Sequence, residues 1–372
     1  MTTDTVGLYV HIPFCLKKCN YCDFCSYASI DAELRRKYID ALVLEILSYK
    51  DKGLSVDTLF FGGGTPSLLS DEEFLRIVSA IRNSFTILTD AEFTLEANPK
   101  TLTREKLECY TSAGVNRISI GLQSIHENEL KKLGRIHNFD DFLESYRIVR
   151  ECGIDNVNID LMYGIPEQTK DSFARTLDKI ISISPEHISL YGLIIEEGTP
   201  FYEQRDFLPV PTEDDECDMY YMAAQRLARD GFSHYEISNY AKPGFECRHN
   251  LKYWKCREYI GVGVAAHSCF VGERFSRADQ ITEYVKDFSK KQEKVTLTPD
   301  SQSYEYVMLG LRLSTGISLS DFSLRFNCDF LDGRRQTIDR LVDSGLIRLS
   351  EDRLALTERG MYVSNSILTE LL

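Results

Sequence analysis

Short apolar runs alternate with longer amphipathic segments over the first two hundred residues of the chain. Regular alternation of strands and helices is typical of a parallel sheet with right-handed crossover connections. We therefore predict an α/β fold that forms a partial (β/α)6 barrel, with functional groups at the carboxyl ends of its strands. The strand-like runs are residues 8–11, 58–61, 92–96, 117–121, 156–161 and 187–191, and the helix-like segments are residues 32–49, 71–85, 104–113, 139–152 and 170–181.

The pattern changes after about residue 200. Pro209-Val-Pro211 followed by an acidic run indicates a linker and the start of a helix over residues 216–230. The next stretch, residues 232–275, is rich in Gly, Tyr, His and Cys and is expected to be irregular. Near the carboxyl end, the pattern predicts a helix over 335–344, a cap at Gly345 and a hairpin of 346–349 with 353–356. These elements outline a smaller α+β domain similar to a winged helix.

We divide the chain into a core at residues 1–205, a connecting segment at 206–300 and a carboxyl-terminal domain at 301–372. The length of 372 residues, with 43% apolar residues, is sufficient for this organisation. A formal net charge of −14 argues against general binding of nucleic acids or anionic membranes, and it favours a packing role for the winged-helix-like domain.

The cellular location is inferred from what the sequence lacks. No run approaches the roughly 20 apolar residues of a membrane span, and the first residues do not form a basic stretch followed by an apolar one. Eleven cysteines spread over a long chain do not form the dense framework of a small secreted domain. We expect a cytoplasmic protein kept reduced.

Three of these cysteines are closely spaced. Cys15, Cys19 and Cys22 form Cys-x3-Cys-x2-Cys, directly after the first apolar run. Thiolates are soft ligands that suit zinc and iron–sulfur clusters. A structural zinc site requires four ligands and usually a second paired motif, whereas three thiolates can hold three corners of a cubane and leave one iron open. We favour a 4Fe-4S cluster over free cysteines of a reduced protein.

Other candidate binding residues follow the predicted strands. Gly62-Gly63-Gly64-Thr65 comes after the strand at 58–61, and consecutive glycines let the backbone approach a ligand closely. Glu96, Gln123 and Asp160 occupy later strand ends, and Arg135 offers a planar fork suited to a carboxylate. Each of these residues has a structural alternative, such as a tight turn or a solvated acid. Together, on successive strands, they indicate a ligand pocket.

These motifs resemble the coproporphyrinogen dehydrogenase-like, HemN-related branch of the radical S-adenosylmethionine (SAM) superfamily. The resemblance covers nearly the whole chain, from Leu8 to the carboxyl-terminal domain. It implies that an electron delivered by a donor to the cluster cleaves SAM into methionine and a 5′-deoxyadenosyl radical. It assigns Cys15, Cys19 and Cys22 to the 4Fe-4S cluster, assigns Tyr9, Gly63, Gly64, Thr65, Glu96, Gln123, Arg135 and Asp160 to SAM contacts, and places Tyr21 near the adenine.

Two features separate the chain from the oxidative enzymes of this branch. The cluster motif of those enzymes resembles Cys-x3-Cys-x2-Cys-x-Cys, and a substantial extension precedes their cluster strand. Here Phe24 stands where the fourth cysteine is expected, the nearest cysteine is displaced to Cys25, and few residues precede the first strand. Both features argue against a coproporphyrinogen dehydrogenase activity.

A third feature points to heme. His249-Asn250-Leu-Lys-Tyr253-Trp254 resembles the heme-binding signature of the HemW heme chaperones. Histidine is a normal axial ligand of heme iron, and the aromatic pair offers apolar surface to a porphyrin. The structural alternative is a core histidine beside two aromatic residues. Flanking Cys247 and Cys256 are further possible iron ligands, supported by proximity alone.

The sequence therefore predicts a heme chaperone, built on a 4Fe-4S and SAM-binding core, that transfers heme to apo-proteins such as membrane respiratory enzymes. The alternative is an enzyme, either an oxygen-independent coproporphyrinogen III oxidase or a radical SAM enzyme with a related substrate. A DNA-binding regulator is a third, weaker alternative. Whether the radical chemistry is used is left open by the residues.

Overall fold

The computed structural model describes residues 5–372. The expectation that the first residues do not form a basic stretch followed by an apolar one therefore falls partly on residues 1–4, which lie outside the described residues. Within the described residues, the largest sheet has twelve strands in the order β14-β13-β12-β11-β1-β4-β5-β6-β7-β8-β10-β9. Its central part is parallel and confirms the predicted α/β class. The six predicted strands are β1 (Val6–Ile12), β4 (Ser55–Gly63), β5 (Thr86–Ala97), β6 (Arg117–Gln123), β7 (Asn156–Tyr163) and β8 (His187–Gly192).

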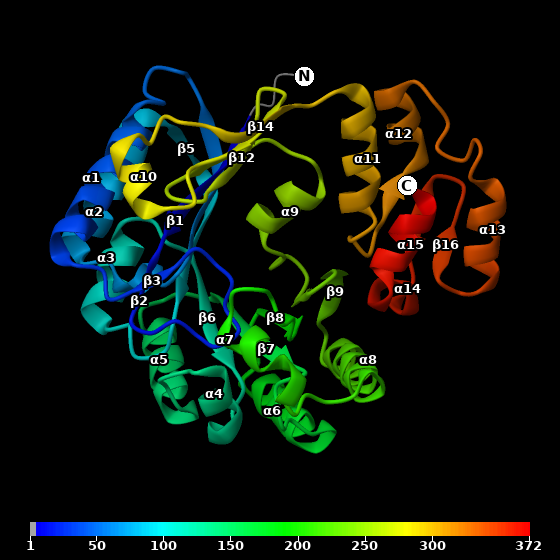
Figure 1. Cartoon of the computed structure of the whole chain (residues 1–372), viewed down its shortest axis with the longest axis horizontal. Helices are drawn as coiled ribbons and strands as arrows, with labels where there is room; N and C mark the ends of the chain where they lie inside the picture. Colours follow the sequence, from blue (N-terminus) through cyan, green and yellow to red (C-terminus); the bar gives the residue numbers. More distant parts are fainter. Residues whose placement is uncertain (1–4) are drawn as a thin grey trace.

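Helices cover the outer side of this curved sheet, as Figure 1 shows. They are α1 (Ala32–Leu47), α2 (Asp71–Ser84), α3 (Arg104–Ser112), α4 (Glu127–Leu133), α5 (Phe139–Glu151) and α6 (Lys170–Ile183). Five of them match predicted segments, and the short α4 was not predicted. Ser70 and Glu73 form a reciprocal capping box that starts α2, which buries the apolar side chains of Phe74 and Ile77 against the sheet.

The expectation of an irregular stretch at residues 232–275 is wrong. This part contains β9 (Ser233–Glu236), β10 (Asn239–Ala241), α9 (Arg248–Trp254), β11 (Tyr259–Val262), β12 (His267–Phe270) and β13 (Glu273–Ser276), and β14 (Gln292–Thr296) follows. Strands of three or four residues are too short for a visible alternation of apolar and polar positions. Strand β11 pairs in parallel with β1, which brings the segment that includes α9 into contact with the barrel.

Near the cysteine motif, the short strands β2 (Phe14–Cys15) and β3 (Tyr27–Ala28) pair with each other at the two ends of the cysteine loop. Helices α7 (Pro200–Gln204), α8 (Glu213–Arg229) and α10 (Ile281–Lys286) come from the regions after β8 and β13. Among the described residues, none of the helices combines the length and apolar character that a membrane crossing requires.

The carboxyl-terminal part has its own apolar cluster, which includes Leu311, Phe322, Ile338 and Leu354. Its elements are α11 (Pro299–Gly310), β15 (Ile317–Ser318), α12 (Leu319–Phe326), α13 (Arg335–Asp343), β16 (Ile347–Leu349), β17 (Arg353–Leu356), α14 (Glu358–Tyr362) and α15 (Ser364–Leu371). Helix α13 is followed by Gly345 at a φ of 72° and by the β16–β17 hairpin, as the sequence predicts. The three segment boundaries stay a prediction.

Candidate functional site

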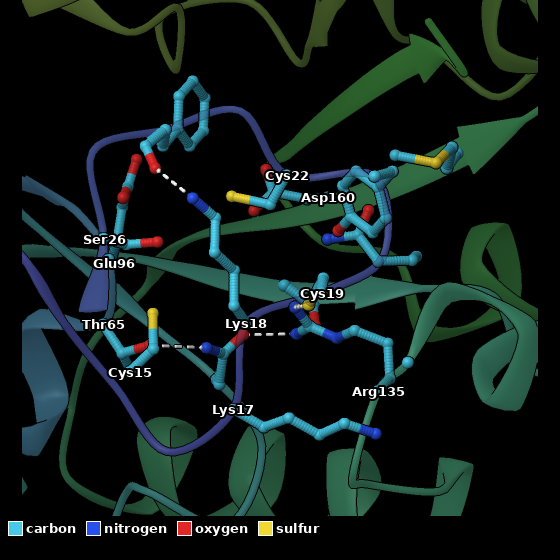
Figure 2. A pocket seen from close by; sticks show the side chains of 18 of the residues that line it. Cys15, Lys17, Lys18, Cys19, Cys22, Ser26, Thr65, Glu96, Arg135 and Asp160 are labelled. Atoms are coloured by element: carbon cyan, nitrogen blue, oxygen red, sulfur yellow. Dashed lines mark hydrogen bonds between the residues drawn. The ribbon is translucent and has the colours of Figure 1, made fainter. Parts of the chain in front are cut away.

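A cavity of about 440 Å³ lies at the carboxyl ends of the parallel strands, beside the cysteine loop (Figure 2). It brings together most of the residues selected from the sequence. The selected residues that line it are Cys15, Cys19, Tyr21, Cys22, Gly63, Gly64, Thr65, Glu96, Gln123, Arg135 and Asp160. Tyr9 and the heme-motif residues do not line this cavity.

The cysteine thiols have polar neighbours that suit metal-bound sulfur. The Thr65 hydroxyl donates a hydrogen bond to Cys15 Sγ at 3.7 Å, and Arg135 Nη1 donates one to Cys19 Sγ at 3.5 Å. Burial raises the pKa of the Cys22 thiol, so a positive partner is needed to hold it as thiolate. Three soft thiolate ligands lie on one loop, and hydrogen-bond donors point at two of the sulfur atoms. This combination fits the three-cysteine ligand set of an iron–sulfur cluster.

The arrangement of the three cysteines is compatible with a cluster. Among residues 5–372, no three His, Cys, Asp or Glu side chains converge tightly enough to hold one metal ion. A cubane cluster is larger, because each of its cysteines binds a different iron. Cys15, Cys19 and Cys22, which line one cavity, are therefore compatible with the predicted 4Fe-4S cluster.

The displaced fourth cysteine points elsewhere. The Cys25 thiol donates to the backbone oxygen of Asp279 at 3.3 Å and lies 3.8 Å from the Tyr27 hydroxyl. Phe24, which occupies the position of the oxidase cysteine, lines the cavity and is 62% exposed. The local chain path therefore places an apolar ring, rather than a fourth thiol, beside the cluster loop.

The glycine run lets β4 approach the start of the cysteine loop. A Cβ on Gly64 would lie only 2.8–2.9 Å from backbone atoms of Phe14, Ile12 and Pro13. The neighbouring Gly63 has a φ of 108°, and its amide donates to Glu96 Oε2 at 3.2 Å. Only glycine satisfies these backbone demands without displacing the loop.

Two carboxyl groups face the cavity from neighbouring parts of the sheet. Burial, reinforced by the charge of Asp160, raises the pKa of Glu96 to about 8. Burial also raises the pKa of Asp160, against hydrogen bonds from Asn158, Ser189 and Ser119 that favour its charged form. Paired acids with raised pKa values are typical of a site that receives a cationic or hydroxylated ligand, such as the ammonium and ribose groups of SAM.

Arg135 connects the cysteine loop to the carboxyl ends of β5 and β6. Its Nη2 donates to the Gly121 carbonyl at 2.5 Å and also to Asn98 Oδ1. Asn98 in turn donates from Nδ2 to the Thr65 hydroxyl at 2.9 Å, so it joins Arg135 to the glycine loop. Asn98 was not selected from the sequence, although it lies in the same Leu95-Glu-Ala-Asn-Pro99 run as Glu96. Gln123 adopts a φ of 72°, a strained backbone for a non-glycine residue that is common at binding sites.

Tyr9 lies deeper in the barrel than the cavity. Its hydroxyl is 3.0 Å from His11 Nδ1, and its ring stacks on Phe60 at a centroid distance of 6.2 Å. The His249 ring stacks on Phe60, with the ring centroids 5.2 Å apart. Its centroid lies 6.5 Å from that of Tyr9. The predicted SAM contact of Tyr9 stays a prediction, and the structure places Tyr9 between the SAM cavity and α9.

The heme motif forms α9, and His249 is buried there. The Thr58 hydroxyl hydrogen-bonds to His249 Nδ1 at 2.9 Å, and the Tyr253 hydroxyl hydrogen-bonds to Nε2 at 2.7 Å. Burial, with the charges of Lys252 and Arg117, lowers the pKa of His249 to about 3. Trp254, one position after Tyr253, lies under the Arg312 guanidinium, 5.7 Å from the ring centroid. The imidazole is therefore neutral, and both of its nitrogens have partners.

Comparisons with known proteins place the chain in a family. The Radical SAM superfamily matches residues 9–180, and the HemN C-terminal domain matches residues 297–363. The protein named heme chaperone HemW of Bacillus subtilis is 36% identical over 369 residues, which cover 96% of this chain and 97% of the relative. Proteins of the same name from Lactococcus lactis and Escherichia coli are 34% and 35% identical, each over 98% of this chain and 96% and 97% of the relative. The chain belongs to the HemW family of radical SAM proteins.

A solved structure supports the same fold. Coproporphyrinogen III oxidase (HemN) from Escherichia coli, described as a radical SAM enzyme, aligns with a TM-score of 0.88 at 23% identity and covers 99% of this chain and 90% of that one. Membership of the radical SAM superfamily implies a 4Fe-4S cluster and SAM for this chain, and these groups would supply radical chemistry wherever SAM is cleaved. Its own residues would provide the cluster thiols at Cys15, Cys19 and Cys22 and orient SAM through the cavity side chains.

Proposed function

We propose that this protein is a heme chaperone that binds heme and transfers it to apo-proteins, with a 4Fe-4S and SAM-binding core. The observation that carries the proposal is the full-length likeness to proteins named heme chaperone HemW, combined with the His249-Asn250-x-x-Tyr253-Trp254 motif on α9. Phe24 in place of a fourth cysteine supports the same assignment over the oxidase alternative.

The state of His249 is chemically suitable for iron. Neutral imidazole is the form that ligates a metal, and a pKa of about 3 keeps His249 neutral throughout the physiological range. Ligation requires one nitrogen to exchange its present partner for iron. Nε2 is the better candidate, because its partner Tyr253 lies on the same short helix, whereas Thr58 lies in β4 and anchors Nδ1 to the sheet. Heme binding would therefore break the His249–Tyr253 bond and leave the Thr58 bond to orient the ring.

The stacked rings of Tyr9, Phe60 and His249 connect the heme motif to the cavity. Tyr9 and Phe60 lie on β1 and β4, the strands that lead to the cysteine loop and the glycine run. This contiguity gives the 4Fe-4S and SAM site a physical route by which its occupancy could bias heme binding on α9. Electrons for the cluster would come from a separate donor, and the heme recipients would be apo-proteins, membrane respiratory enzymes among them.

The test uses one anaerobic preparation reconstituted with iron and sulfide. Heme is titrated into it and the Soret absorbance followed, and the loaded protein is then mixed with an apo-cytochrome whose heme uptake has a distinct spectrum. We expect binding near one equivalent and net transfer to the apo-protein. Coproporphyrinogen, SAM and a reductant are added to a second portion, where we expect no useful conversion to protoporphyrinogen.

The two arms separate the alternatives. SAM-dependent decarboxylation without heme uptake would overturn the chaperone assignment in favour of the oxidase. If the protein binds heme but does not pass it to an apo-protein present in excess, its role would be restricted to heme storage. That result would contradict a role in transfer.

A further inference from the structure

A second cavity, of about 310 Å³, lies on the side of α9 that faces the beginnings of β1 and β4. It is lined by Thr5, Asp57, Thr58, Arg248, Leu251, Lys252, Lys255 and Arg257. Four of these side chains are cationic and one is a carboxylate, in a chain whose net charge is −14. A local excess of positive charge in an acidic protein indicates a site for an anion. We name this cavity the basic pocket.

The cations of the basic pocket differ in how they are held. Lys252 is nearly buried, and its Nζ pairs with Asp57 Oδ1 at 2.7 Å, while the Thr5 hydroxyl donates to Oδ2 at 3.0 Å. Lys252 therefore already neutralises the one carboxylate of the pocket. Arg248 donates to the Asp90 backbone oxygen at 2.6 Å.

Two cations remain available to a ligand. Lys255 and Arg257 are exposed, and within residues 5–372 neither side chain makes a hydrogen bond or an ion pair. Arg257 offers the planar fork that pairs with a carboxylate, and Lys255 adds a compact second charge. The basic pocket can thus accept an anion without first breaking an internal ion pair of these two residues.

The basic pocket adjoins the heme motif directly. Thr58, which lines it, holds His249 Nδ1, and Lys252 lies between His249 and Tyr253 in α9. The chain also makes room for this packing at Gly7 of β1, where a Cβ would lie 2.8 Å from Lys252 Cδ and 3.3 Å from His249 Cε1. The candidate iron ligand lies on α9, and the two free cations follow at the C-cap of this helix and just beyond it.

We propose that the basic pocket binds the propionate carboxylates of heme, with Lys255 and Arg257 as the principal partners. Heme carries two carboxylates on one edge of an apolar ring, so a cationic pocket beside an imidazole matches its distribution of charge. This inference rests on the proposed function. It places the propionate edge of heme at the strand beginnings, on the Thr58 side of His249, while the iron would bind Nε2 on the Tyr253 side.

The test compares heme with its dimethyl ester, whose carboxylates are uncharged, on the reconstituted full-length protein. The variant is Lys255→Gln with Arg257→Gln, since both side chains are exposed and unpaired and the fold does not depend on them. The matched control is Arg175→Gln with Lys286→Gln, which removes the same charges from exposed positions outside the basic pocket. We expect the first variant to bind heme roughly ten-fold more weakly, as two partly exposed charge pairs would predict.

The ester distinguishes a carboxylate contact from a general effect. We expect it to bind wild type and variant equally, and we expect the control variant to bind heme as wild type does. Equal heme affinity of variant and wild type would overturn the pocket assignment. An equal loss of affinity for heme and for its ester would also overturn it. Either result would leave the chaperone function standing. Failure of the wild type to bind heme at all would overturn both the pocket assignment and the proposed function.

Discussion

The Nε2 of His249 lies 2.7 Å from the hydroxyl oxygen of Tyr253, one helical turn later in α9. The two rings meet edge to face, with centroids 5.1 Å apart. The residue proposed to bind heme iron is thus masked by another residue of the same motif. On the proposed function, α9 would have a second state, in which the imidazole is bonded to iron and no longer to the tyrosine.

Removal of the tyrosine hydroxyl should favour the second state. Tyr253→Phe keeps the aromatic ring but removes the group that competes with iron for Nε2. We expect heme affinity to rise about five-fold, since a hydrogen bond contributes on the order of 1 kcal/mol net. Heme titration followed at the Soret band measures the change. An affinity that falls would mean that the hydroxyl itself supports the bound heme.

The cluster should depend on three cysteines and not on the fourth. Cys15→Ala, Cys19→Ala and Cys22→Ala should each abolish the visible absorption of the reconstituted 4Fe-4S cluster. Cys25→Ala should retain it, because the Cys25 thiol is directed to the backbone of Asp279 and does not line the cavity. Iron and sulfide content measured on the same samples provides a second readout. Loss of the cluster in Cys25→Ala, with retention in Cys22→Ala, would refute this ligand set.

Glu96 should make the stability of the cofactor-free protein depend on pH. Its folded-state pKa of about 8 exceeds its ordinary value of 4.5, so between these values the folded state binds a proton that the unfolded state releases. Stability therefore falls as pH rises through this window. Glu96→Gln removes the titrating group, and its amide oxygen can still accept from the Gly63 amide.

Thermal unfolding checks this effect without any cofactor. At pH 8.5 we expect Glu96→Gln to unfold about 2 °C above wild type, a shift that corresponds to roughly 1 kcal/mol in a large domain. At pH 5 the two proteins should unfold at similar temperatures, because Glu96 is then protonated in the folded wild type. A variant that is less stable at pH 8.5 would show that the charged carboxylate is satisfied in the site.

The sequence predicted the barrel and its cavity better than the surroundings of α9. Long amphipathic helices and buried parallel strands have clear periodicity, and the groups at the ends of β4, β5 and β6 share one edge of the sheet by topology. The burial of His249 could not be read in this way, because it depends on pairing between β11 and β1, which are about 250 residues apart in the chain. Asn98 was missed for a similar reason, since its partners Thr65 and Arg135 come from other loops.

Arg135 should be needed for SAM binding. Its guanidinium lies among the cavity residues, and a paired contact to the SAM carboxylate would contribute on the order of 1.5–3 kcal/mol. Arg135→Ala should therefore weaken SAM binding roughly ten- to a hundred-fold. Arg104→Ala, which removes an exposed arginine outside the cavity, is the matched control. Unchanged SAM affinity in Arg135→Ala, with an intact cluster, would remove this residue from the site.

The last prediction concerns the ligand of heme iron. His249→Gln keeps a side chain that can hydrogen-bond to Thr58 or Tyr253 but removes the imidazole, so it tests ligation with less disturbance of the buried site than alanine. We expect His249→Gln and His249→Ala to bind heme more weakly than wild type or with a shifted Soret band. His267→Ala serves as the control, because His267 is exposed and its loss reports on adventitious binding to surface imidazole.

Circular dichroism confirms folding of each variant. An unchanged Soret band and affinity in folded His249→Gln would assign the iron to another ligand, and Cys247→Ser and Cys256→Ser would then identify whether a flanking thiol binds it.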